Sequence, residues 1–188
     1  MAQFTLTFQT IFIACCLSLA TAKSDSGSFS GNLSPKALGL KKEKLTHLHF
    51  YFHDIVAGPR PTAVRVAEPT AANSSLSLFG AVTVMDNPLT ITPKLRSKLV
   101  GRAQGIYASD SQNEPSLLMV FNLVFTAGKF NGSSLSILGR NAVFSSVREM
   151  PIVGGSGVFR FARGYAEART YSFDPYAIVG YDVYAFHY

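Results

Sequence analysis

The chain has 188 residues, 47% of them hydrophobic, and a formal net charge of +6. Its only cysteines, Cys15 and Cys16, lie near the start, which excludes cysteine nucleophiles, thiolate metal sites and redox pairs from the rest of the chain. The basic residues are scattered and form no stripe interleaved with aromatics, so nucleic acid is not an expected partner.

Residues 1–22 have the features of a secretory signal peptide. They contain no charged side chain and hold an apolar run from Ile11 to Ala20, followed by a small-x-small cleavage sequence that ends at Ala22. The run is too short to span a bilayer, and no later run is long enough to anchor the chain in a membrane. We therefore expect a secreted protein whose mature part has no disulfide and depends on its core for stability. A basic secreted protein suits an acidic matrix such as a cell wall.

The remaining chain divides into an arm and one all-β domain. Residues 23–44 are rich in Ser, Gly and Lys without periodicity, which predicts a disordered N-terminal arm. Residues 45–188 contain short β-patterned runs separated by turn signals, among them Asn87-Pro88 and Gly154-Gly155-Ser156-Gly157. The predicted strands are 45–55, 78–86, 98–109, 117–127, 133–140, 142–148, 157–172 and 176–187.

Seven or eight antiparallel strands with short connections indicate a sandwich or a closed barrel. The run 117–127 is apolar on both faces, with Met119 and Phe121 on one and Leu118 and Val120 on the other. A barrel wall needs only one dry face, so the second face predicts contact with another subunit. We therefore predict a self-associating barrel, whose interior would hold packed side chains or one small ligand.

Three histidines, His47, His49 and His53, lie on one face of the run 45–55. An H-x-H pair is used by cupin-like metal sites, which would need a further ligand from a neighbouring strand. The opposite face carries Leu48, Phe50 and Phe52, so the histidines are expected to point outward. Outward-facing histidines are favoured over a metal site, and neither a metal nor another cofactor is expected.

Asp54 shares a face with the apolar residues of the same run. A buried carboxylate is costly unless it is paired, so Asp54 is either half of a structural Asp–Arg pair or a group kept for function. In an apolar cavity its pKa would rise, and it could then donate as well as accept a proton. The residue pattern leaves both alternatives open.

Two sequons fall in predicted loops of the domain. Asn73 begins Asn73-Ser74-Ser75, and Asn131 begins Asn131-Gly132-Ser133. In a secreted protein these sequences predict N-glycosylation.

Six segments spread over residues 45–188 together resemble plant dirigent proteins. They are FYFHDI (50–55), VMDNPLT (84–90), LVGRAQGIYASDSQ (99–112), FNLVFTAGKFNGSSLSILGRN (121–141), VREMPIVGGSGVFRFARGYAEA (147–168) and YDVYAFHY (181–188). The resemblance implies an eight-stranded antiparallel β-barrel with a central cavity, assembled as a homotrimer in the apoplast. It also implies a protein that oxidises nothing itself. A separate oxidase, laccase or peroxidase makes phenoxy radicals from monolignols, and the dirigent protein makes them couple with one handedness.

The resemblance also assigns candidate site residues. Asp54 of HDI matches the family's cavity aspartate and Arg148 of VRE its cavity arginine, which makes both candidate catalytic residues. The candidate substrate-binding residues are Phe52, Arg102, Tyr107 and Asn141.

One departure from the lignan-forming pattern leaves two functions open. Asn141 stands where lignan-forming members have a second cavity aspartate, and the pattern GRN…VREMP resembles the branch that contains pterocarpan synthases. Those proteins dehydrate an isoflavanol through a quinone methide. The chain is therefore expected either to direct phenoxy-radical or quinone methide conversion in lignan-type phenylpropanoid metabolism, or to act as such a lyase.

Overall fold

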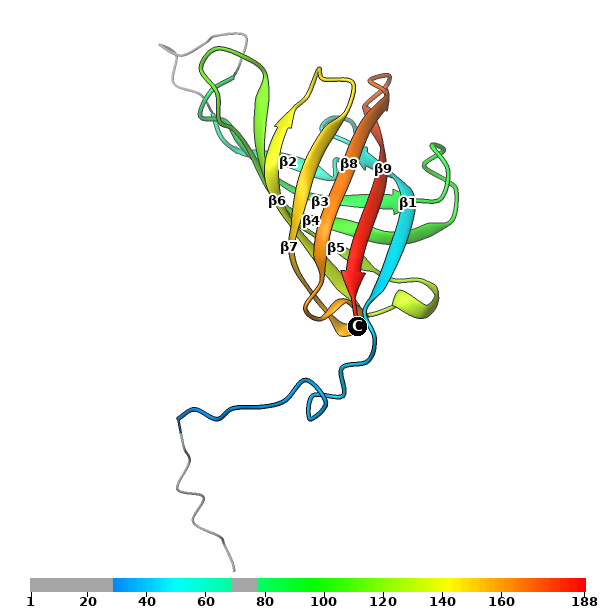
Figure 1. The fold of residues 1–188 in the computed structure, drawn as a ribbon. Helices are drawn as coiled ribbons and strands as arrows, with labels where there is room; N and C mark the ends of the chain where they lie inside the picture. The colour runs from blue at the N-terminus through cyan, green and yellow to red at the C-terminus, as the bar shows by residue number, and fades with distance from the viewer. Residues whose placement is uncertain (1–28, 69–77) are drawn as a thin grey trace, which may run out of the picture. The chain divides into compact units, whose positions relative to one another are not determined.

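The computed structural model describes residues 29–68 and 78–188 (Figure 1). Two separate units are distinguished, one ending at Gly39 and one spanning Leu40–Tyr188. Residues 29–39 contain a turn, in which the Ala37 N–H donates to the Ser34 carbonyl at 3.0 Å. Within the described ranges no helix is long and apolar enough to cross a membrane. The predicted signal peptide and Asn73 lie outside the described residues.

The described residues of the second unit contain nine antiparallel strands. They are β1 (Lys44–Asp54), β2 (Ala63–Ala67), β3 (Val82–Thr90), β4 (Leu99–Ser109), β5 (Ser116–Phe125), β6 (Ser134–Ala142), β7 (Arg148–Ser156), β8 (Arg163–Ser172) and β9 (Ala177–His187), with single 3₁₀ turns at η2 (Gly128–Phe130) and η3 (Gly157–Phe159). Their order in the sheet is β1-β9-β8-β7-β6-β5-β4-β3-β2, and β1 also pairs with β3.

The predicted eight-stranded antiparallel barrel is confirmed, with β2 as an additional strand on β3. The barrel closes where Tyr51 and Phe52 of β1 pair with Thr90 and Leu89 of β3. Figure 1 shows the first and last strands, β1 and β9, side by side in the wall. The sequence did not predict β2, because a five-residue edge strand next to prolines gives little periodicity to detect.

The prediction that Asn87-Pro88 ends a strand was wrong, since β3 continues to Thr90. The Asp86 N–H points away from β4 and donates to the Thr62 carbonyl at 2.8 Å. Pro88 lies two residues further on, so its missing N–H belongs to that same edge and costs no bond to β4.

The prediction of a strand at 142–148 and a turn at 154–157 was also wrong. The chain turns before Arg148, and β7 extends through Gly154 and Gly155, which pair with Ser136 and Leu135 of β6. A Cβ at Gly155 would lie 2.5 Å from the Phe159 carbonyl oxygen, so glycine allows η3 to fold over the strand end.

Aromatic rings fill one end of the barrel, which we call the closed end. Phe159 and Phe130 stack with ring centroids 5.0 Å apart, and Phe159 lies 5.6 Å from Phe125. Phe50 joins them through Phe125, at 6.3 Å. The buried His187 covers Phe159 and bonds to Thr46 Oγ1 at 2.8 Å, so this end holds a packed core.

Candidate active site

The opposite end of the barrel, the open end, contains two adjoining cavities. The inner cavity, of about 70 Å³, is lined by residues of seven strands and of the loops that follow β6 and β8. Its polar lining comes from Asp54, Tyr107, Asn141, Arg148, Thr170 and Tyr181, and its apolar lining includes Phe52, Met119, Phe173 and Val179. The outer cavity, of about 350 Å³, is lined by residues that include Ala63, Arg65, Glu68, Thr83 and Ser109. Tyr107 and Leu117 line both cavities, so the two adjoin at these residues, and we call the pair the hollow.

Asp54 is the last residue of β1 and bonds to two neighbours through separate oxygens. Asn87 Nδ2 donates to Oδ1 at 2.9 Å, and the Tyr107 hydroxyl donates to Oδ2 at 3.1 Å. Burial raises the pKa of the Asp54 carboxyl, and the two hydrogen bonds oppose that rise. Asp54 is therefore a carboxyl group in a mainly aromatic and apolar wall that can carry a proton.

Tyr107, near the end of β4, stands between the two cavities. Burial raises the pKa of its phenol, the Asp54 charge raises it further, and a hydrogen bond from Thr83 opposes both. Tyr107 therefore stays protonated at neutral pH. Its hydroxyl can donate to an ionised Asp54 or turn and accept from a protonated one.

Arg148 begins β7 and is buried without a carboxylate partner in the described part of the chain. Its Nε donates to Asn141 Oδ1 at 3.1 Å, and Nη1 donates to the Ser145 carbonyl at 3.3 Å. Burial lowers the pKa of the guanidinium, and neighbouring Tyr181 opposes this. A buried cation held only by neutral acceptors is suited to bind a phenolate or carbonyl oxygen in the inner cavity.

Asp54 and Arg148 do not form the structural ion pair that the sequence left open. Each has its own neutral partners, although both line the inner cavity. A structural pair would neutralise the cavity, whereas separate charges leave a proton donor and a cation for a ligand.

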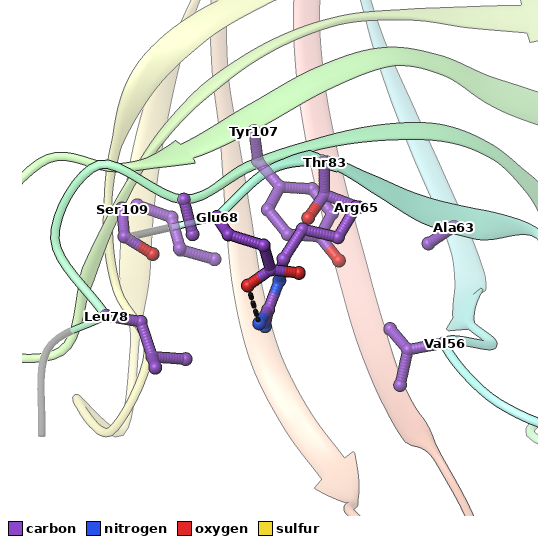
Figure 2. A pocket seen from close by; sticks show the side chains of 10 residues that line it. Val56, Ala63, Arg65, Glu68, Leu78, Thr83, Tyr107 and Ser109 are labelled. Atoms are coloured by element: carbon purple, nitrogen blue, oxygen red, sulfur yellow. Dashed lines mark hydrogen bonds and ion pairs between the residues drawn. The ribbon is translucent and has the colours of Figure 1, made fainter. Parts of the chain in front are cut away.

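The outer cavity is formed mainly by β2, β3 and β4. Figure 2 shows Arg65 and Glu68 close to the Tyr107 ring, joined by an ion pair of 3.2 Å between Arg65 Nη1 and Glu68 Oε2. Both side chains are exposed, so this pair contributes little to stability. It brings charged groups to the mouth of the hollow.

Five of the six candidate catalytic and substrate-binding residues line the inner cavity. They are Phe52, Asp54, Tyr107, Asn141 and Arg148. Arg102 does not line it, because its Nε bonds to Asp86 Oδ1 at 2.5 Å on the outer face of the barrel. The substrate-binding assignment of Arg102 is therefore withdrawn. Along β4, Arg102 and Tyr107 differ by an odd number of residues, so they lie on opposite faces.

The three histidines do not share one environment. His47 and His49 are exposed and both bond to Asp182 Oδ1, at 2.8 and 2.9 Å. His53 also points outward from β1, but it is fully buried, with Nε2 2.7 Å from Thr90 Oγ1. Thr90 and Tyr176 cover it. Over residues 29–68 and 78–188, no group of three or more His, Cys, Asp or Glu side chains is arranged to hold a metal.

Sequence reasoning missed two residues that hold Asp54, one bonded to it directly and the other bonded to the first. Asn87 looked like part of a turn because proline follows it, yet it lies fully buried in β3 beside Asp54. Thr62 lies before the unpredicted strand β2 and donates to Asn87 Oδ1 at 2.5 Å. The available signal was the two-residue alternation of a strand, which places Asn87 on the same face as Thr83 and Met85.

Comparisons with known proteins agree with this architecture. The family model described as Dirigent-like protein matches residues 45–186. The chain belongs to the dirigent family. Among curated dirigent relatives, it is 52% identical over 183 residues to pterocarpan synthase 1 of Glycyrrhiza echinata, covering 95% of this chain and 97% of the relative. It is 53% identical over 180 residues to dirigent protein 21 of Arabidopsis thaliana, covering 94% of each.

A solved dirigent structure gives the same result. The structure of the pterocarpan synthase dirigent protein GePTS1 superposes with a TM-score of 0.73 and 57% identity, over 79% of this chain and 87% of that one. Relatives named for pterocarpan synthesis and relatives named only as dirigent proteins are thus similar to this chain at nearly the same identity. Overall identity therefore does not distinguish among the reactions of the family.

Proposed function

We propose that this dirigent protein controls the handedness of a product formed from a phenolic quinone methide, with Asp54 as the acid. The observation that carries the proposal is a single buried carboxyl with a raised pKa in an aromatic cavity, while Asn141 occupies the position of the second acid. One acid is sufficient for a reaction within one folded substrate.

The expected reaction is the loss of water from an isoflavanol-type phenol. The substrate phenol first ionises to solvent at the oxygen that becomes the quinone methide carbonyl. Asp54 then gives its proton to the leaving hydroxyl, the carbon–oxygen bond breaks, and water and a neutral quinone methide form. A phenol oxygen of the same molecule then bonds to the electrophilic carbon, and its proton returns to the Asp54 carboxylate. The step is redox-neutral, since the only net change is the loss of water and the closure of a ring.

The cavity contributes position and charge to this reaction. Arg148 can hold the quinone methide oxygen, which gains negative charge as the ring closes. The walls formed by Phe52, Tyr107 and Tyr181 can hold a planar substrate with one face toward the nucleophile. A selectivity of ~100:1 requires about 2.7 kcal/mol between the two approaches, which a few such contacts can supply.

Stereoselective coupling of phenoxy radicals is the second candidate function. The outer cavity, of about 350 Å³, adjoins the inner one and offers space for a second phenolic ring, which supports this candidate. Here the radicals would come from a separate oxidase, laccase or peroxidase, and the products would be of lignan type. Secretion to the apoplast, where such oxidases act, remains a proposal based on residues 1–22.

The deciding experiment is chiral chromatography of the products from two incubations. Isoflavanols are supplied without an oxidant, and coniferyl alcohol is supplied with laccase. We expect turnover of an isoflavanol to one enantiomer of a ring-closed product. An enantiomeric excess only from coniferyl alcohol with laccase would assign the second function, and racemic or absent products in both would reject both functions.

We also propose that the barrel self-associates, as a trimer, through a row of exposed apolar side chains. This apolar row consists of Val64, Val84, Ile106, Val120 and Leu138, which are paired in sequence across β2 to β6. Neighbours that are exposed, apolar and in register form a continuous patch, which soluble proteins usually cover. Val120 of this row belongs to the outer face of the run 117–127, which is apolar on both faces.

A further inference from the structure

Asp54 is held by two chains of hydrogen bonds that differ in chemistry. Thr62 Oγ1 donates to Asn87 Oδ1 at 2.5 Å, and Asn87 Nδ2 donates to Asp54 Oδ1 at 2.9 Å. On the other side, Thr83 bonds to the Tyr107 phenol, whose hydroxyl donates to Asp54 Oδ2 at 3.1 Å. The first chain ends in an amide that cannot reverse its direction, and the second ends in a hydroxyl that can.

The orientation of the Asn87 amide is fixed from both ends. Its Oδ1 accepts the Thr62 hydroxyl, so the amino group must face Asp54. Thr62 is itself fixed, because its N–H donates to the Ile55 carbonyl at 2.8 Å and its carbonyl accepts the Asp86 N–H at 2.8 Å. Asn87 is fully buried, so water cannot replace either bond.

A fixed donor on Oδ1 determines where the acid proton of Asp54 lies. A proton on Oδ1 would compete with the fixed Asn87 N–H for the same oxygen and weaken that hydrogen bond. A proton on Oδ2 meets the Tyr107 hydroxyl, which can turn and accept it. Tyr107, the partner of Oδ2, lines both cavities, whereas Asn87, the partner of Oδ1, lines neither.

We propose that Asn87 is a positioning residue that reserves Oδ1 of Asp54 as a permanent acceptor and thereby places the transferable proton on Oδ2, facing the substrate. Asn87 touches no substrate in this arrangement and acts through Asp54. The inference rests on the proposed function only in assigning Asp54 as the acid, so its test includes a readout that needs no substrate.

The test compares Asn87→Leu, Asn87→Asp and an exposed control, Asn113→Asp. The first readout is the titration of the Asp54 carboxyl by ¹³C NMR, assigned by the signal lost in Asp54→Asn. Asn87→Leu removes the donor to Oδ1, and Asn87→Asp adds a like charge beside it. Both should raise the pKa of Asp54 relative to the wild type, and Asn87→Asp by at least about one unit. Asn113→Asp should leave that pKa unchanged.

The second readout is the pH dependence of isoflavanol turnover. The titratable groups around Asp54 are Tyr107 from β4, Arg148 from β7 and Tyr181 from β9, with Arg65 from β2 acting on Tyr107, and all of them are kept in the variants. Asn87→Leu should lower turnover roughly 10- to 100-fold, because the proton is no longer held on one oxygen. Asn87→Asp should move the alkaline limb of the profile to higher pH, a change that a merely structural role would not cause.

Folding is monitored by thermal melting, and Thr62→Val serves if the Asn87 variants do not fold. This substitution keeps the shape of Thr62 but frees the Asn87 amide to rotate, and it should move the Asp54 titration in the same direction by a smaller amount. An unchanged Asp54 titration in the folded variants would overturn the proposal. If the wild type turns over no substrate, the proposed function fails while the NMR titration still decides the role of Asn87.

Discussion

The two ends of this barrel are built from the same strands but hold opposite interiors. At the closed end, Phe159 contacts Phe125 and Phe130, and the polar atoms of His187 are bonded at the rim. At the open end, Asp54 and Arg148 are buried apart from each other with neutral partners. The closed end thus stabilises the barrel. The open end lowers that stability, because it buries two charged groups apart from each other, and this keeps both groups available for reaction.

Replacing the acid should give the largest effect and should be confined to the open end. Asp54→Asn retains the shape and the acceptor for Asn87 but cannot transfer a proton. Turnover should fall by about 10²- to 10⁴-fold, measured as kcat on the substrate identified above. The melting temperature should not fall. Unchanged turnover would remove Asp54 from the mechanism.

The opposite result is expected for a substitution at the closed end. Phe159→Ala removes a fully buried ring and should lower the free energy of unfolding by about 3–5 kcal/mol, measured by urea denaturation. At a temperature where the variant is folded, the enantiomeric excess of the product should equal that of the wild type. A loss of selectivity would mean that the two ends are not independent.

Removing the positive charge of Arg148 should weaken substrate binding, whereas the core substitution at Phe159 should leave selectivity unchanged. Arg148→Met keeps much of the side chain's volume without the charge, and KM should rise roughly 10- to 100-fold, the value of a hydrogen bond to a charged group. Stability should be unchanged or higher, since no buried carboxylate loses its partner. An unaltered KM would show that the guanidinium does not contact the substrate.

The pH dependence of the free energy of unfolding should also distinguish the open end from the closed end, with a smaller effect. The pKa of Asp54 is raised in the folded state, so its contribution to stability is full below the usual value of 3.8 and is lost as the pH rises through the folded pKa. Asp54→Asn should therefore gain stability relative to the wild type as the pH rises above 3.8. Urea denaturation across that range measures the difference, and parallel curves would contradict the burial of the charge.

The smallest effect is expected on the outer wall. Ile106→Lys places a charge in the middle of the apolar row and should shift the protein toward monomer in analytical ultracentrifugation. Gln104→Lys, on the same face of β4 and outside the row, is the matched control. Enantioselectivity per barrel should persist in both, because the cavity faces the other side of the strand.

The sequence predicted the barrel because alternation is strong where one face is packed, as in the run with Met119, Phe121 and Leu123. Asp54 was detected because it interrupted such a face. Asn87 was not, since the following proline suggests a turn unless the free edge of β3 is known. The outward placement of Arg102 follows from its odd spacing to Tyr107 in the same strand, so local parity could have excluded it. The separation of Asp54 from Arg148 depends on pairing between distant strands, which no local pattern contains.

The barrel closes through only two residue pairs between β1 and β3, whereas β1 pairs with β9 along its whole length. This short seam ends at Phe52 and Leu89, two residues before Asp54 in β1 and two residues after Asn87 in β3. Opening it breaks few backbone bonds, so amide hydrogens there should exchange with solvent faster than those between β1 and β9. The Asp54 carboxyl group thus lies next to the strand pairing that has the fewest residue pairs in the barrel wall. Local opening of this pairing would admit a bulky ring without unfolding the closed end.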